Sequence, residues 1–243
     1  MGRLMAIEGR KNAQDARRGK IFTKVVRELS VAARAGGSDP KSNPRLRLAM
    51  DRGLAVNMPR DAMERAIKKA AGELEGVSYE EIRYEGYAPG GVAVIVDCMT
   101  DNKNRTASEI RHIFAKYGGN MGAAGSVAFQ FSKKGYLAVE KSAAKEDALM
   151  ELALEAGAED FRSEDADVFE ITTELSSFES VKAQIEGKGI VTQTAELQMM
   201  PSSTTAVGDK APALLKLLDM LEDNDDVQKV WSNGDIEDEY LEA

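Results

Sequence analysis

Five basic side chains share one face of the helix predicted for residues 15–35, and the chemistry open to them is the binding of anions. At 100° per residue, a stripe about 100° wide holds Arg17, Lys20, Lys24, Arg27 and Arg34. Apolar side chains fill the opposite face, which predicts contact with a protein core. A solvated helix face normally mixes both charge signs, whereas Glu28 lies only at the edge of this stripe. The pattern therefore favours a phosphate-binding face.

Charge is divided unevenly along the chain. Residues 1–72, the basic head, hold 17 Lys and Arg against 7 Asp and Glu, whereas residues 73–243 hold 15 against 34. Phosphate would attract the head and repel the acidic body, which restricts how the protein approaches a nucleic acid. Aromatic residues are nearly absent from the head, so we expect recognition of the backbone without base stacking. The other candidate cations are Lys11, Arg18, Arg45, Arg47, Lys68 and Lys69.

The elements that must position these cations are helical. Amphipathic patterns predict helices at residues 15–35, 44–56 and 60–71, separated by Gly36-Gly37 and by a break at Pro59. Together they predict a three-helix domain over residues 1–76.

Strand signals begin after a weakly patterned acidic segment, residues 73–81. Strands are predicted at 84–87, 92–99 and 127–131, with a helix that Thr106 opens as a capping box and Tyr117 ends. Residues 136–199 then follow the order strand, helix, strand, strand, helix, strand, which is typical of a ferredoxin-like fold. A last helix at 212–223 and a strand at 227–232 cannot form a domain alone. We expect them to complete the middle sheet, and docking on the inserted domain is the alternative.

The predicted fold class is therefore α+β. A three-helix domain at the N-terminus is followed by two ferredoxin-like α/β domains, the second inserted into the first. The middle domain takes residues 77–133 plus 202–243, and the inserted domain takes residues 134–201.

Signals for catalysis are poor, and we predict no enzyme activity, catalytic residue, metal site or cofactor. The sequence has one histidine, His112, on the polar side of its helix, and one cysteine, Cys98, on the buried face of a strand. A zinc site built from His and Cys within one chain is therefore excluded in practice. The pairs Glu222-Asp223 and Asp225-Asp226 could hold Mg²⁺, but we interpret them as a solvated helix end.

Two loops are candidate partner contacts. Lys103 and Arg105 follow a turn rich in Asp and Asn. The second loop is rich in glycine, which exposes backbone amides, and its candidate residues are Gly119, Asn120, Met121 and Gly122.

A single cysteine is typical of a protein in a reducing compartment. The sequence contains no run of about 20 apolar residues, so it predicts no membrane span. We expect a cytoplasmic protein that is a monomer in solution.

Several long runs in the same order resemble the YebC/PmpR family, among them AQDARRGKIFTKVVREL, YEGYAPGGVAVIVDCMTDNKNRT and KYGGNMGAAGSVAFQF. The resemblance covers nearly the whole chain. It implies a cytoplasmic three-domain protein without enzyme activity. Family members are described as DNA-binding transcriptional regulators, and related proteins, including a mitochondrial translational activator, act at the ribosome on stalled synthesis.

The sequence thus leads to one main hypothesis, a non-enzymatic regulator of gene expression that binds DNA, ribosomal RNA or the ribosome. Because both nucleic acids offer phosphates, the residues do not choose between them. The alternative is a module that senses a small metabolite through its ferredoxin-like domains. A metal-dependent nuclease is the third possibility, with weak support from the acidic pairs.

Overall fold

The computed structural model describes residues 14–72, 77–237 and 240, and for residues 14–18 it describes the backbone alone. The chain divides into two compact units, one made of residues 1–129 with 204–243 and the other of residues 130–203. The boundaries between three domains stay a prediction.

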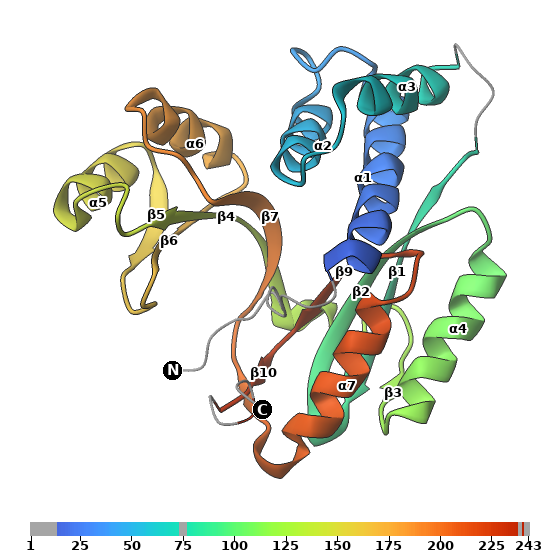
Figure 1. Ribbon diagram of the computed structural model, residues 1–243. Helices are drawn as coiled ribbons and strands as arrows, with labels where there is room; N and C mark the ends of the chain where they lie inside the picture. Colours follow the sequence, from blue (N-terminus) through green and yellow to red (C-terminus); the bar gives the residue numbers. More distant parts are fainter. Residues whose placement is uncertain (1–13, 73–76, 238–239, 241–243) are drawn as a thin grey trace. The chain divides into compact units, whose positions relative to one another are not determined.

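Three helices form the basic head, as predicted (Figure 1): α1 (Gln14–Gly36), α2 (Pro44–Ala55) and α3 (Arg60–Ala70). Their apolar faces meet in a core that contains Leu29, Leu46 and Met63, all fully buried. Asn43 begins α2, because its side chain accepts the N–H of Leu46 while donating to carbonyl oxygens of the loop and of α1.

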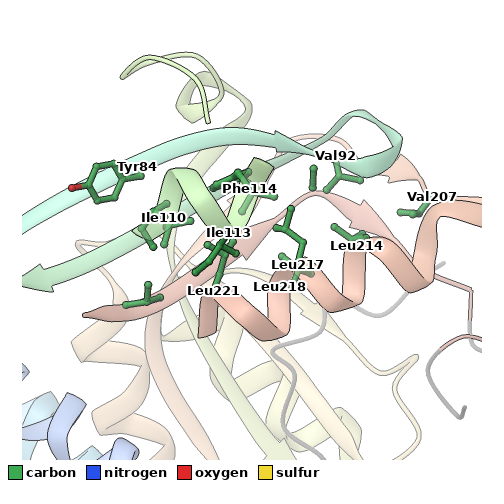
Figure 2. Packing of buried hydrophobic residues seen from close by; sticks show 14 of the residues in the cluster. Tyr84, Val92, Ile110, Ile113, Phe114, Val207, Leu214, Leu217, Leu218 and Leu221 are labelled. Carbon is green, nitrogen blue, oxygen red and sulfur yellow. The ribbon is translucent and has the colours of Figure 1, made fainter. Parts of the chain in front are cut away.

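The middle sheet contains four antiparallel strands in the order β3-β1-β2-β9. Their bounds are β1 (Glu80–Ala88), β2 (Val92–Thr100), β3 (Asn120–Met121) and β9 (Val227–Ser232). Helices α4 (Lys103–Lys116) and α7 (Ala211–Glu222) cover one face of this sheet. Figure 2 shows Phe114 of α4 and Leu214, Leu217 and Leu221 of α7 against the strands.

The C-terminal segment returns to this middle sheet, as predicted. Strand β9 pairs with β2, with Val230 opposite Val96. Beside it, β8 (Thr205–Ala206) and β10 (Gly234–Asp235) form a short parallel pair. The alternative, docking of this segment on the inserted domain, is therefore wrong.

The inserted unit has the predicted ferredoxin-like topology, since its strand order is β5-β6-β4-β7. Its elements are β4 (Phe131–Glu140), α5 (Glu146–Glu155), β5 (Ala158–Arg162), β6 (Val168–Thr173), α6 (Phe178–Gly187) and β7 (Thr194–Pro201). The middle domain also combines a four-stranded sheet with two helices, but its elements follow one another in a different order along the chain. In this domain β1 and β2 form a hairpin before α4.

Two local predictions were wrong. The strand predicted at 127–131 is a 3₁₀ turn, Ala128–Gln130, that leads into β4. Val127 and Ala128 of this segment donate their N–H groups to the carboxylate of Glu85, so these two donors are not available to a strand partner. Helix α4 begins at Lys103 instead of Thr106, because the side chain of Asn102 accepts the N–H of Arg105 and begins the helix one turn earlier.

Within the described parts of the chain, no helix is long and apolar enough to cross a membrane.

Candidate nucleic-acid interface

The cations of α1 contact the end of α7 within the same compact unit. Residues 222–226, which we call the acidic turn, connect α7 to β9. Lys24 Nζ donates to the carbonyl oxygen of Glu222 at 2.7 Å, and Lys20 Nζ donates to that of Asp223 at 3.0 Å. The carbonyl oxygens at the end of a helix lack partners within the helix and carry partial negative charge. The basic side chains therefore cap α7 from outside.

Arg27 makes the most buried of these contacts. Its Nη1 atom lies 2.8 Å from the carbonyl oxygens of Met99 and Asp225 and 2.6 Å from Asp226 Oδ1. The side chains of Arg27 and Asp226 are only 11% and 4% exposed. The guanidinium also lies 5.1 Å from the ring centre of Tyr79. In such a buried site, an ion pair is screened little by solvent, so removal of one partner has a large cost.

Asp226 joins three elements of the unit. Besides Arg27 of α1, its carboxylate accepts hydrogen bonds from Arg105 Nη2 and Thr106 Oγ1 of α4, each at 2.7 Å. A weaker bond comes from Thr100 Oγ1 at the end of β2, at 3.2 Å. Burial disfavours the charged carboxylate, but the hydrogen bonds from Arg105, Thr106 and Arg27 outweigh it and lower the pKa of Asp226. The prediction of a solvated helix end was wrong for this residue.

Lys24 is held in a similarly dry position. Burial lowers the pKa of its ammonium group to about 8, although the nearby negative charge of Glu222 opposes this shift. Lys24 is therefore less available to an external anion than its place in the helical pattern indicated.

The space beside these contacts is a polar cleft of about 470 Å³. Its walls combine both charge signs and are formed by Lys20, Arg27, Asp101, Arg105, Glu109 and residues 223–226. In the described part of the chain, no group of three or more His, Cys, Asp or Glu side chains is arranged to hold a metal ion.

Cations elsewhere on the head differ in how far they are engaged. Arg34 donates to Ser78 Oγ, and Arg47 donates to the carbonyl oxygen of Pro40 at 3.3 Å and makes a further interaction. Arg45 forms ion pairs with Glu28, at 2.7 Å, and with Glu81. These three side chains are partly committed to contacts within the unit.

Lys68 and Lys69 are the most available of the predicted site residues. Both are exposed in the last turn of α3, and neither pairs with an acidic side chain among the residues described. Arg60 at the start of α3 and Lys41 before α2 are also exposed. Sequence reasoning left these two out of the site, although they lie in the same +10 head.

The side chains of three predicted cations lie outside the described part of the structure. Lys11 lies outside the described residues. Arg17 and Arg18 lie in the first turns of α1, where the backbone alone is described.

The two candidate loops have structural partners of their own. Lys103 pairs with Glu80 at 2.6 Å, and Arg105 pairs with Asp101 as well as with Asp226. In the glycine-rich loop, Asn120 and Met121 form β3. Gly122 donates its N–H to the carbonyl oxygen of Glu85 at 2.8 Å.

Gly119 is required by close packing, because a Cβ atom there would lie 2.7 Å from the carbonyl oxygen of Tyr87. No signal in the sequence alone indicated this approach of the loop to β1.

A buried carboxylate holds the far end of this loop. Glu85 is 5% exposed and accepts the N–H groups of Gly125, Val127 and Ala128, each at 2.8 Å. Burial disfavours its charge, but these three hydrogen bonds outweigh the burial and lower the pKa of Glu85. Sequence reasoning missed this residue, since a single Glu in a strand pattern carries no distinctive signal.

We expect Glu85→Gln to lower the free energy of unfolding by about 2 kcal/mol, because the amide offers one acceptor oxygen where the carboxylate offers two charged ones. The folded-state pKa of Glu85 is lowered, so its contribution is present above the unfolded pKa and is lost as the pH falls toward the folded one. Urea unfolding followed by Trp231 fluorescence, at neutral and acidic pH, measures both effects. Trp231 is the single tryptophan and lies on β9 of the same unit.

Glu80→Gln is the control for this change. Its exposed ion pair with Lys103 contributes at most about 0.5 kcal/mol. Equal stabilities for the two variants at neutral pH would show that the loop does not depend on Glu85.

The two residues considered for catalysis have ordinary surroundings. Cys98 is buried, and its burial raises the pKa of the thiol to about 12, so it is not a thiolate nucleophile at neutral pH. His112 is exposed on α4, as predicted.

Comparison with known proteins identifies the family. Residues 3–73 match the model described as "TACO1/YebC protein N-terminal domain", and residues 79–234 match "TACO1/YebC second and third domain". A "Probable transcriptional regulatory protein" of Xanthomonas campestris pv. campestris (strain B100) is 58% identical, covering 97% of this chain and 98% of its own. Another of that name, from Desulfosudis oleivorans, is 54% identical, with coverages of 98% and 97%.

A solved structure agrees with these relatives. The crystal structure of a conserved hypothetical protein from Aquifex aeolicus matches with a TM-score of 0.87 and 47% identity, covering 96% of this chain and 97% of that one. The resemblance to the YebC family seen in the sequence is thus confirmed. Because the two family models together match nearly all of its length, this chain belongs to the TACO1/YebC family.

Proposed function

We propose that this protein is a non-enzymatic regulator of gene expression that binds nucleic acid through its basic head. The relatives named probable transcriptional regulatory proteins support the regulatory role. The observation that carries the nucleic-acid part is the exposed cationic end of α3, where Lys68 and Lys69 have no acidic partner among the described residues. Such side chains contact phosphates and contribute a salt-dependent affinity without sequence information.

The contact surface that we propose differs from the one that the helical pattern of α1 favoured. It comprises the exposed cations of the head, with Arg17 and Arg18 retained from the sequence prediction. The exposed cations that make no side-chain hydrogen bond or ion pair among the described residues are Lys41, Arg60, Lys68 and Lys69. The partly engaged Arg34, Arg45 and Arg47 lie in the same head and add to its positive field.

DNA and ribosomal RNA are both targets that this surface could contact, because each presents a phosphate backbone. A cytoplasmic location and a monomeric state accompany the proposal. The small-metabolite module stays a prediction without a specific observation in its favour.

Affinity measured across a salt series tests the proposal, with the full chain against duplex DNA and against purified ribosomes. If the head contacts about four phosphates, the logarithm of the association constant should fall against the logarithm of the salt concentration with a slope of about −3.6 on DNA. The stronger of the two interactions under physiological salt identifies the target. Absence of salt-dependent binding to both would contradict the proposed function.

A further inference from the structure

The basic face of α1 contacts the acidic turn through the same side chains that would bind an external anion. Lys20, Lys24 and Arg27 recur at intervals of four and three residues, so they lie on one side of the helix and span about 10 Å of its axis. Their acceptors are the last carbonyl oxygens of α7 and the carboxylates of Asp223 and Asp226. Four successive phosphates of one DNA strand, about 3.4 Å apart along the axis, span about the same length.

We propose that the acidic turn is an intramolecular stand-in for nucleic acid, which covers these three cations and limits the affinity of the head until the turn is displaced. This inference rests on the proposed function and adds a regulation of the same head. It explains why cations that the sequence pattern assigned to a phosphate face contact carboxylates and carbonyl oxygens of the chain itself.

The contact is graded from a dry interior to a wet edge. The innermost pair, Arg27 with Asp226, is nearly inaccessible to solvent, whereas at the edge the Lys20 and Asp223 side chains are 39% and 61% exposed at a separation of 2.6 Å. Exposed pairs are weak and screened by salt. A polyanion can therefore compete first for Lys20 and then for the cations behind it.

The surroundings of the contact also favour competition by charge. The adjacent cleft is lined mainly by charged side chains, so water and ions reach the edge of the contact. An apolar interface would instead resist displacement by a polyanion. The acidic turn also repels the phosphates that approach it, so the covered state both hides cations and opposes binding.

The test removes charge from the turn without touching the buried pair. Asp223→Asn with Asp225→Asn changes two exposed carboxylates of the turn. Asp209→Asn with Asp219→Asn is the matched control, because these exposed carboxylates lie before and along α7, outside the cleft. Both variants change the net charge by the same amount.

Two measurements are made on the full chain. The first is the rate at which acetic anhydride modifies Lys24 without nucleic acid, read by mass spectrometry. The second is affinity for duplex DNA and ribosomes across the salt series. We expect the turn variant to show a Lys24 modification rate and an affinity each at least about threefold above those of the control, with a steeper salt slope because more phosphates are contacted.

The outcomes separate the two proposals. If the wild type binds but the turn variant matches the control in affinity, the stand-in is wrong and the proposed function survives, whatever the modification rate. An unchanged modification rate would likewise overturn the stand-in. If neither wild type nor variants bind nucleic acid at low salt, the proposed function itself fails. Urea unfolding of both variants checks that they remain folded.

Discussion

Replacing Asp226 with asparagine should lower the free energy of unfolding by about 3 to 5 kcal/mol, the range for breaking a buried ion pair by removing one partner. The substitution keeps the size of the side chain but leaves Arg27 charged in a site that is 11% exposed. Arg27 already has an Nε atom without a hydrogen-bond partner among the described residues, so it has little means of compensation. The loss of the Thr106 hydrogen bond at 2.7 Å adds to this cost.

Urea unfolding at neutral pH, followed by Trp231 fluorescence, measures this change. The pair of Asp226 with Arg105 adds less, because the Arg105 side chain is 42% exposed and solvent screens it. Asp225→Asn is the control. Arg27 contacts the backbone oxygen of Asp225, so the exposed carboxylate of Asp225 is not needed for that hydrogen bond. A loss below about 1 kcal/mol for Asp226→Asn would refute a central role for this carboxylate.

Acid should remove the same contribution without any mutation. Because the folded-state pKa of Asp226 is lowered, its stabilisation is present above the unfolded pKa and is lost as the pH falls through the folded one. The stability difference between the wild type and Asp226→Asn should therefore shrink below about pH 4.

The largest effect on binding should come from Lys68→Glu with Lys69→Glu. Each change removes a phosphate contact and places a negative charge beside the phosphate backbone of the nucleic acid. Affinity for nucleic acid should therefore fall by about tenfold to a hundredfold at moderate salt. The salt slope on duplex DNA should become shallower by about 1.8, corresponding to two phosphates. Because both side chains are exposed, the fold should change little, apart from a few tenths of a kcal/mol lost at the end of α3.

The matched control is Lys145→Glu with Lys188→Glu, which alters two exposed lysines of the inserted unit by the same total charge. It separates a local phosphate contact from the general effect of a more negative protein. Equal affinities for the two double variants would show that the end of α3 is not part of the contact surface.

Much of the fold was predictable because apolar periodicity records which side of an element is buried. The pattern of α1 predicted its buried face, and Leu29 and Val25 do lie in the core. Strand β9 was predicted with its observed bounds, Val227–Ser232. The order of elements in the inserted unit was enough to predict its topology, since few chain paths connect such a series without crossing.

Local reasoning failed where a distant side chain replaced a local partner. Residues 127–131 alternate apolar with polar or small side chains as a strand would, yet Glu85, more than 40 positions earlier, accepts the N–H groups of Val127 and Ala128. The capping box at Thr106 failed for a related reason, because the Thr106 hydroxyl contacts the carboxylate of Asp226 while Asn102 begins the helix.

In the candidate site, too, some properties were predictable from the sequence and others were decided only by the tertiary structure. Composition and helical spacing established that the head is basic and that α1 has one cationic face, because these properties depend on residue types and short intervals alone. The tertiary structure decided which acceptor each cation contacts. Lys20 and Lys24 find theirs about 200 residues away, and only the return of α7 to the middle sheet brings the acidic turn to α1. Coulombic attraction falls with distance in space and not along the chain, so a helical pattern specifies the sign of a partner without its identity.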